Sequence, residues 1–284
     1  MLSAVGWWRC LLCAVAALNV SVWSLSLVAL KRARPDLSVE AYAARRLQVS
    51  LSGAYVLGCA FRCVFPVFDI PRLVLTDSWL SSVVVGRSVA TVAELCFAGQ
   101  WALMLHQAAV ATRSPFARIA SRSIVPMIGI AEACSWYAVL TTANIAHVAE
   151  NSLWGLAAAL VVISMVTVIV HWPAAQRLVF TAWCVAGAAY VAFIFLSDVP
   201  MYWSRWTADQ ASGHHYLTLA QGLLDVSTRW VVSYRWEDWR NEVAWMSLYF
   251  SGGVWASISL IYAPAPGVRD ALEERNHVVS PLAQ

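Results

Sequence analysis

The sequence predicts an all-α, polytopic transmembrane helical bundle with about seven spans. Hydrophobic residues make up 60% of the 284 residues and charged residues only 12%, with a mean hydropathy of +0.63. This balance is typical of chains that fold in a bilayer. A helix needs about 20 mostly apolar residues to cross the hydrocarbon core. Stretches that meet this need lie at residues 4–30, 48–66, 80–106, 124–147, 153–171, 178–197 and 243–263.

The first stretch is predicted to be a retained helix and not a secretion signal. Its apolar run is long, and Lys31, Arg32 and Arg34 follow it in place of a small-residue cleavage site. Lys31 is also the only lysine of the chain, so a retinal Schiff base in the last span is excluded.

Basic residues in the connections predict the orientation, because short cytoplasmic loops are rich in arginine and lysine. Such residues follow the first, third and fifth spans: Lys31, Arg32, Arg34, Arg45, Arg46, Arg113, Arg118, Arg122 and Arg177. We therefore expect an outside amino terminus and a cytoplasmic carboxyl terminus, with the polar tail 264–284 inside. The outer loop 198–241 carries four arginines against this trend, but long loops follow the rule less strictly.

The outer loop 198–241 is predicted to contain an amphipathic helix. Apolar residues recur in it at spacings of three and four: Tyr216, Leu219, Leu223, Val226 and Trp230. Asp225 lies off this stripe and can pair with Arg229 one turn later. A helix lying on the membrane surface fits this pattern. An eighth span across 215–234 is the alternative, and it would bury both charges and place the tail outside.

The last span contains a small-residue surface at Gly252 and Gly253, which favours close approach by another helix. The sequence contains neither an internal repeat nor a second folded domain. Residues 1–284 are therefore expected to form a single integral membrane domain.

Charged residues inside the predicted spans are the strongest functional signal, because such charges are costly in hydrocarbon. Arg87 and Glu94 lie in the third span and Glu132 in the fourth. Counting about 1.5 Å per residue from the outer ends puts both glutamates at about 22 Å and Arg87 at about 12 Å. Arg87 and Glu94 are seven residues apart, so they share one helix face.

Two interpretations of these intramembrane charges remain open. If the third and fourth spans are neighbours, Glu94 and Glu132 can share a proton, since adjacent like charges are unfavourable. Arg87 can then neutralise the carboxylate that stays ionised, which predicts a proton-handling or cation-binding pocket. The alternative is an internal ion pair that only fixes helix register.

Four predicted outer segments, 65–79, 147–154, 198–206 and 235–240, mix charges with aromatic rings. Tryptophan collects at membrane interfaces, which accounts for most of the 16 Trp residues. Arginines among them could bind a phosphate or carboxylate while rings pack on an acyl chain, quinone or sugar. The alternative is a lid whose acidic residues neutralise its own arginines. The candidate ligand-binding residues are Arg87, Tyr202, Arg205, Trp206, Arg235 and Arg240.

Acid and base catalysis at the outer face requires carboxyl groups, and the candidates are Glu94, Glu132, Glu150 and Asp198. His214 and His215 are weak metal candidates, because adjacent histidines on a helix point in different directions. The sequence identifies no cofactor, and it lacks the GxSxG, P-loop, GxGxxG and HExxH signatures.

Three classes of function remain for a protein of this kind. They are an enzyme acting on a lipid or other amphipathic ligand, a proton-coupled transporter, and an accessory subunit of a larger membrane complex. The intramembrane charges favour the first two, with the enzyme narrowly ahead, whereas the missing catalytic signatures favour the third. Membrane lipid and other membrane subunits are the expected partners. A net charge of +3, with basic residues on the predicted inner side, gives no sign of nucleic-acid binding.

Overall fold

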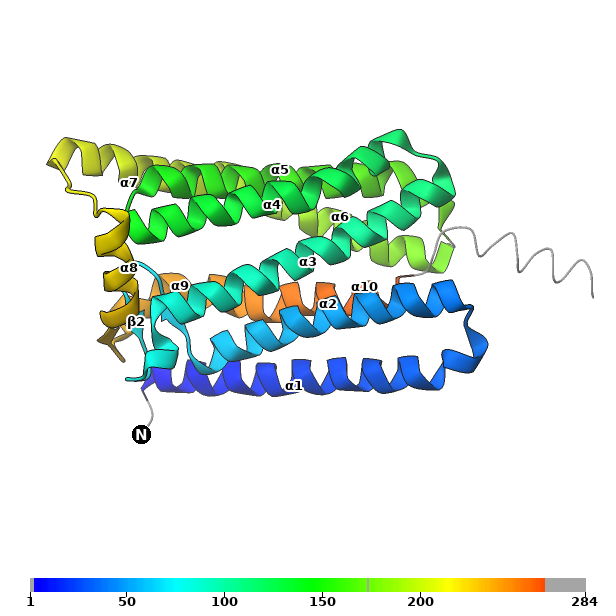
Figure 1. The fold of residues 1–284 in the computed structure, drawn as a ribbon, viewed down its shortest axis with the longest axis horizontal. Coiled ribbons are helices and arrows are strands. Elements are labelled where there is room, and N and C mark those ends of the chain that lie inside the picture. The colour runs from blue at the N-terminus through cyan, green and yellow to red at the C-terminus, as the bar shows by residue number, and fades with distance from the viewer. Residues whose placement is uncertain (1–2, 173, 264–284) are drawn as a thin grey trace, which may run out of the picture.

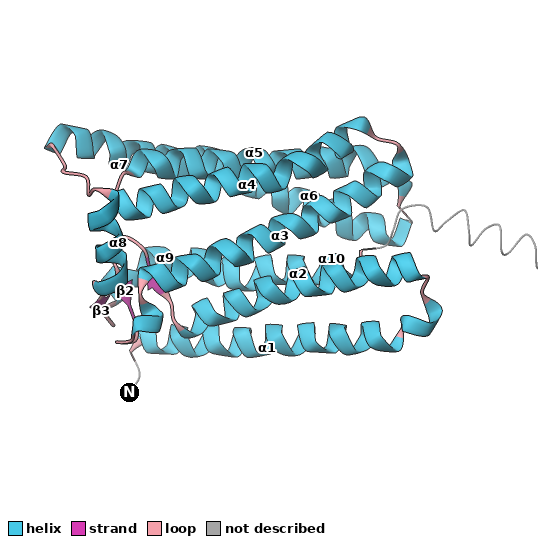
Figure 2. Cartoon of the chain, viewed as in Figure 1, coloured by secondary structure: helices cyan, strands magenta, loops and turns pink. Residues whose placement is uncertain are grey.

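The computed structural model describes residues 3–172 and 174–263, so the predicted polar tail 264–284 lies outside the described residues. Within these ranges the chain is almost entirely helical (Figure 2). The α-helices are α1 (Ala4–Arg32), α2 (Val39–Val64), α3 (Val83–Thr112), α4 (Pro115–Thr141), α5 (Asn144–Val168), α6 (Ala174–Phe193), α7 (Val199–Ser212), α8 (Leu219–Thr228), α9 (Trp236–Leu248) and α10 (Val254–Ile261).

Seven stretches of helix in the described chain are long and apolar enough to cross a membrane. Two of them are composite. A π-helical segment, Ile194–Asp198, joins α6 to α7, and a second, Tyr249–Gly253, joins α9 to α10. The predicted all-α bundle of seven spans is confirmed, and the chain is an integral, multi-pass membrane protein.

The central helix of the bundle is α3, which crosses the middle of the molecule (Figure 1). It packs on α2 at one side and on α4 at the other. Beyond α2 lie α1 and α10, and beyond α4 lies α5, which carries α6 and α7. The buried side chains of α3, such as Arg87 and Ala93, therefore lie between the two halves of the bundle.

One end of the bundle, termed the lid end, is covered by residues 65–82 and 213–235 (Figure 1). Strands β1 (Val67–Phe68) and β2 (Leu73–Val74) form an antiparallel pair, and β3 (Val231–Val232) lies parallel to β2. Helix α8 lies across the same end. The opposite end, termed the basic end, carries the connections that are rich in arginine.

Sequence and packing together explain the position of α8. Thr218 and Gln221 form a capping box that starts the helix. Gly222 sits directly on the end of α4, where a Cβ atom would lie only 2.0 Å from the Leu140 carbonyl oxygen. A glycine is required for so close an approach of two backbones.

The predicted amphipathic helix of the outer loop is confirmed over Leu219–Thr228, and Tyr216 and Trp230 of the predicted stripe lie outside it. Val226 is buried, whereas Leu219 and Leu223 are exposed, so the apolar stripe does not face the bundle as a unit. Asp225 makes the predicted pair with Arg229 and a second pair with the buried Arg72. Contact with the end of α4, and not the apolar stripe, decides which face is covered.

Helix ends at the lid end differ from the prediction at two places. A left-handed residue, Thr142, ends α4 before residue 147, and α5 begins at Asn144, so the predicted outer segment 147–154 is helical. The helix after α6 continues to Ser212, so the first part of the predicted loop 198–241 is helical too. Hydropathy reports where a helix leaves hydrocarbon, and a helix can continue beyond that point.

A buried polar network joins α2, α3 and α10. The Gln100 amide donates to the Gln48 side chain at 3.2 Å and to the Ser257 carbonyl at 3.1 Å. The Ser257 hydroxyl is 2.9 Å from the Ser52 hydroxyl and 2.5 Å from the Gln100 amide oxygen. Such polar contacts hold membrane helices together because lipid offers the groups no alternative partner.

Replacing Gln100 with leucine is expected to lower the free energy of unfolding by about 1–3 kcal/mol, because Gln48 and Ser257 lose buried partners. Thermal unfolding in a mild detergent measures the change. Ser50→Leu is the control, since Ser50 is exposed on α2. Equal melting temperatures for the Gln100 variant and the native protein would show that this network contributes no stability.

Candidate functional site

The candidate site is centred on Arg87, a buried residue in the second turn of α3. Four carboxylates surround its guanidinium. The Nη2 atom lies 3.1 Å from Glu132, 3.3 Å from Glu150 and 3.8 Å from Glu94. The Nη1 atom lies 3.9 Å from Asp69. These four acidic residues together with Arg87 are termed the carboxylate cluster.

The residues of the carboxylate cluster come from three helices and from the segment 65–82. Glu94 lies on α3, Glu132 on α4, Glu150 on α5 and Asp69 in the segment 65–82. At about 1.5 Å per residue, Glu94 is roughly 16 Å from the start of α3 and Glu132 roughly 14 Å from the end of α4. The two glutamates lie at a similar level, but nearer the lid end than the 22 Å predicted, because α4 ends at Thr141.

Hydroxyl groups position two of the carboxylates. The Thr91 hydroxyl donates to Glu132 Oε2 at 2.6 Å and accepts from the Trp136 indole at 3.0 Å. The Tyr249 hydroxyl donates to Glu94 Oε1 at 2.8 Å. Each of these glutamates is therefore held by a neutral donor in addition to Arg87.

His147 links the cluster to α7 by contacting both Glu150 and Tyr202. His147 Nδ1 lies 2.7 Å from Glu150 Oε2. The His147 ring packs on the Tyr202 ring with centroids 4.8 Å apart, and the Arg205 guanidinium lies 5.3 Å from the Tyr202 centroid. Tyr202, a sequence-predicted ligand residue, is thus next to the cluster, and Arg205 is exposed beside it.

Several buried polar atoms of this region have no hydrogen-bond partner. They include Glu132 Oε1, Asp69 Oδ1, Arg87 Nε and the Ser135 hydroxyl. Glu132 is 3% exposed, so its unpartnered oxygen is shielded from solvent. Buried polar groups are normally paired, and the cluster therefore has capacity for a further hydrogen-bond donor.

The two π-helical segments both contribute to this region. Tyr249 is the first residue of one, and Asp198 is the last residue of the other. The segment 194–198 packs against Gly155 of α5, where a Cβ atom would lie 2.7 Å from the Phe195 ring. Short π-helical insertions frequently occur at functional sites.

The remaining predicted ligand residues lie apart from the carboxylate cluster. Arg235 and Arg240 are exposed near the start of α9, and the nearest carboxylate of Arg235 is Glu237 at 4.0 Å. Trp206 packs on Trp203 with ring centroids 4.9 Å apart. In the predicted outer segments 198–206 and 235–240 the chain is mostly helical, within α7 and α9, and residues 65–82 and 213–235 also cover the lid end.

Asp198 and its neighbours form a smaller charged group. Asp198 and Glu242 lie close enough to Arg205 for their charges to interact. Asp198 itself is only partly buried and contacts none of the cluster carboxylates through a hydrogen bond. This group lies on the α7 and α9 side of the cluster.

The predicted histidine pair is split. His214 Nε2 lies 3.2 Å from the Thr142 hydroxyl, and His215 is exposed. Within residues 3–172 and 174–263, no group of three His, Cys, Asp or Glu side chains is placed to hold a metal ion. The seven cysteines are free thiols.

Sequence reasoning missed several members of the site, among them Asp69 and Tyr249. Asp69 carried a signal, since it lies between aromatic and proline residues in an outer segment, but nothing local placed it against Arg87. Tyr249 lies in the last span beside Gly252 and Gly253, which were predicted to serve helix packing. Gly253 does face the Tyr55 hydroxyl of α2, at 2.8 Å from a Cβ position.

Comparisons with known proteins were made for the whole chain. It matches no protein-family model, no curated protein and no solved structure.

Proposed function

We propose that the protein binds a lipid or another amphipathic ligand at a site that includes the carboxylate cluster, and that the cluster exchanges a proton with this binding. One observation carries the proposal: a single buried arginine faces four carboxylates.

Charge balance supports the proton. With every carboxyl ionised and His147 neutral, one arginine and four carboxylates give a formal charge of −3. Unbalanced charge is strongly unfavourable in a low-dielectric interior, and carboxyl groups there take up protons instead. Glu94 and Glu132 both face the Arg87 Nη2 atom, at 3.8 and 3.1 Å, and like charges at such close range favour a proton on one of the two carboxyl groups. We therefore assign at least one proton to this pair.

The surroundings support an amphipathic ligand. Successive side-chain contacts from Arg205 to Tyr202, His147 and Glu150 connect an exposed guanidinium with the buried cluster. In other membrane proteins, intramembrane charges mark substrate or proton paths. The excess of carboxylate favours a polar head that carries positive charge or donates hydrogen bonds.

The chemistry of the cluster favours proton transfer over covalent catalysis. The hydroxyl nearest the carboxylates, on Thr91, already donates to Glu132 and accepts from Trp136. An enzyme would have to use His147 and Glu150 as an acid and base pair. Proton-coupled binding or transport is therefore placed ahead of a membrane enzyme.

A second candidate function is an accessory subunit of a larger membrane complex. The observation that favours it is the exposed apolar surface of α8 and β3, formed by Leu219, Leu223, Leu224, Val231 and Val232. Exposed apolar patches of this kind mark contacts with partners or with the membrane surface. A stoichiometric partner retained during purification in mild detergent would support this candidate.

The proposed orientation puts the lid end and the amino terminus outside, and the basic end in the cytoplasm. The arginines of the connections after α1 and α3 support it. The cluster is then reached from the outer side of the membrane.

Glu94→Gln and Glu132→Gln test the proposal. Infrared spectra of the native protein at neutral pH are expected to contain the carbonyl stretch of a protonated carboxylic acid, reduced in both variants. Retention of phosphatidylethanolamine, measured by native mass spectrometry, is expected to rise with increasing pH, because the cluster then loses its shared proton while the ammonium head stays charged. Both variants should lose this pH dependence.

Glu237→Gln is the matched control, because Glu237 is exposed on α9. Identical spectra and identical pH dependence in all four proteins would contradict the proposal. Loss of folded protein in the two cluster variants alone, with no change in spectra or retention, would leave the carboxylates a role in helix register only.

A further inference from the structure

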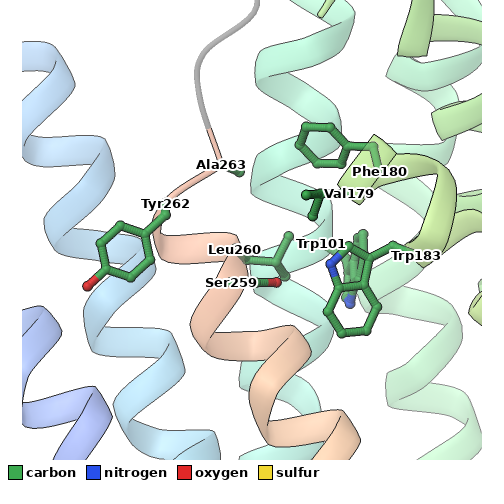
Figure 3. A pocket seen from close by; sticks show the side chains of 8 residues that line it. All are labelled: Trp101, Val179, Phe180, Trp183, Ser259, Leu260, Tyr262 and Ala263. Atoms are coloured by element: carbon green, nitrogen blue, oxygen red, sulfur yellow. The ribbon is translucent and has the colours of Figure 1, made fainter. Parts of the chain in front are cut away.

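A cavity of about 290 Å³ lies between α3, α6 and α10, toward the basic end (Figure 3). Trp101 comes from α3, Phe180 and Trp183 from α6, and Leu260 from α10. Figure 3 shows Leu260 directed toward the two tryptophans, while Tyr262 points to the other side, where its hydroxyl bonds Ser26 at 2.8 Å. The wall of the cavity is thus built from large apolar side chains of three helices.

The cavity opens on the surface of the bundle at a depth occupied by lipid chains. Val179 and Tyr262 at its rim are each 54% exposed. Trp101 lies roughly 16 Å along α3 from the basic end, and Phe180 roughly 9 Å along α6. One leaflet of the hydrocarbon core is about 15 Å thick, so the opening faces the chains of the leaflet at the basic end.

We propose that this cavity binds one acyl chain of a membrane lipid. Both hydroxyl groups of the lining already have partners, because Ser259 donates to the Ala256 carbonyl at 2.7 Å and Tyr262 donates to the Ser26 hydroxyl at 2.8 Å. An occupant therefore mainly meets apolar side chains and indole rings. The volume is at the lower end of the ~300–1,000 Å³ of ligand pockets, so it accommodates part of one chain and excludes a whole lipid.

The inference goes beyond the proposed function, because the cavity is separate from the carboxylate cluster. Glu94 lies seven residues before Trp101, or about 10 Å along α3. The chain's own tail is a poor alternative occupant, since residues 264–284 include Arg269, Asp270, Glu273, Glu274 and Arg275. Charged side chains are unfavourable in an apolar cavity.

Photo-crosslinking of the full-length protein in lipid nanodiscs tests the inference. The probe is a phosphatidylcholine that carries a diazirine on one acyl chain, and mass spectrometry locates the crosslinks. Residues 179–183 and 259–263 are expected to be labelled several-fold more than Leu178 and Val185, which are exposed on α6 away from the cavity. A diazirine fatty acid in a second set of nanodiscs distinguishes a free fatty acid from a phospholipid as the source of the chain.

Ser259→Trp fills the cavity and is expected to abolish the several-fold excess, whereas Leu178→Trp is the matched control and should preserve it. Val179→Trp closes the rim and serves if the first variant fails to fold. Labelling that is uniform along the exposed face of α6, or an excess that persists in the filled variants, would overturn the inference. Glu94→Gln should leave the crosslinks unchanged, so a failure here is distinguishable from a failure of the proposed function.

Discussion

Replacement of Arg87 with methionine is expected to cost about 3–5 kcal/mol of stability. The substitution removes the one cation of the carboxylate cluster and leaves Glu94, Glu132, Glu150 and Asp69 facing one another in a buried site. Thermal unfolding in detergent, followed by the amount of monodisperse protein, measures the loss.

The effect of Arg87→Met is expected to grow as pH rises. Without the arginine, the folded protein tolerates the four carboxyl groups only when most are protonated, whereas in the unfolded chain they ionise near their ordinary pKa of about 4. The native state of the variant then binds more protons than the unfolded state, so stability falls with increasing pH. Melting temperatures measured from pH 5 to pH 8 give this slope.

Arg87→Lys is the informative second variant, because it keeps the charge and loses the planar set of donors. It should restore part of the stability and reduce the pH slope. Arg46→Met is the control for removal of an exposed arginine. Equal losses for the methionine and lysine variants, with no pH dependence in either, would show that packing and not charge explains the role of Arg87.

The bundle itself was predictable because its signal is local. An apolar run of sufficient length defines a span without reference to any other part of the chain. The placement of Arg87 and Glu94 on one face also followed from helix periodicity, and the two side chains are 3.8 Å apart. Composition and period thus identified both the architecture and one side of the cluster.

The rest of the cluster depends on contacts that no local pattern records. Asp69 reaches Arg87 from a turn held by β1 and β2, strands of two residues each. Tyr249 reaches Glu94 through a π-helical segment, which shifts the phase of the last span. The sequence identifies Glu150 as a candidate but places it in an outer segment, because it predicts a fourth span that continues to residue 147. In the structure, Glu150 lies in the second turn of α5.

The orientation of α8 was unpredictable for the same reason. Its apolar stripe predicts a helix on the membrane surface but does not predict which residues meet the bundle. Gly222 and Asp225 make these contacts, and Leu219 and Leu223 are exposed. Two arginines pair with Asp225. Arg72 is buried and distant in sequence, and Arg229 is exposed and one turn away.

Arg72→Met is expected to release α8 from the lid end. Arg72 is 1% exposed and donates to Asp225 at 2.9 Å and to the Val139 carbonyl at 2.7 Å. It also donates to the Asp69 carbonyl, so it joins α8, the end of α4 and the turn that holds a cluster carboxylate. Removing one partner of a buried ion pair costs about 3–5 kcal/mol, and here the cost falls on the attachment of the lid.

Arg229→Met is the matched comparison, because Arg229 pairs with the same carboxylate from an exposed position. Exposed pairs contribute no more than about 1 kcal/mol. Hydrogen exchange of the α8 amides and proteolysis within residues 213–218 should therefore accelerate strongly in Arg72→Met and little in Arg229→Met. Equal acceleration in both would mean that Asp225 holds α8 through either arginine. The stronger response of the buried arginine would show that the lid and Asp69, 3.9 Å from Arg87, are joined through one side chain.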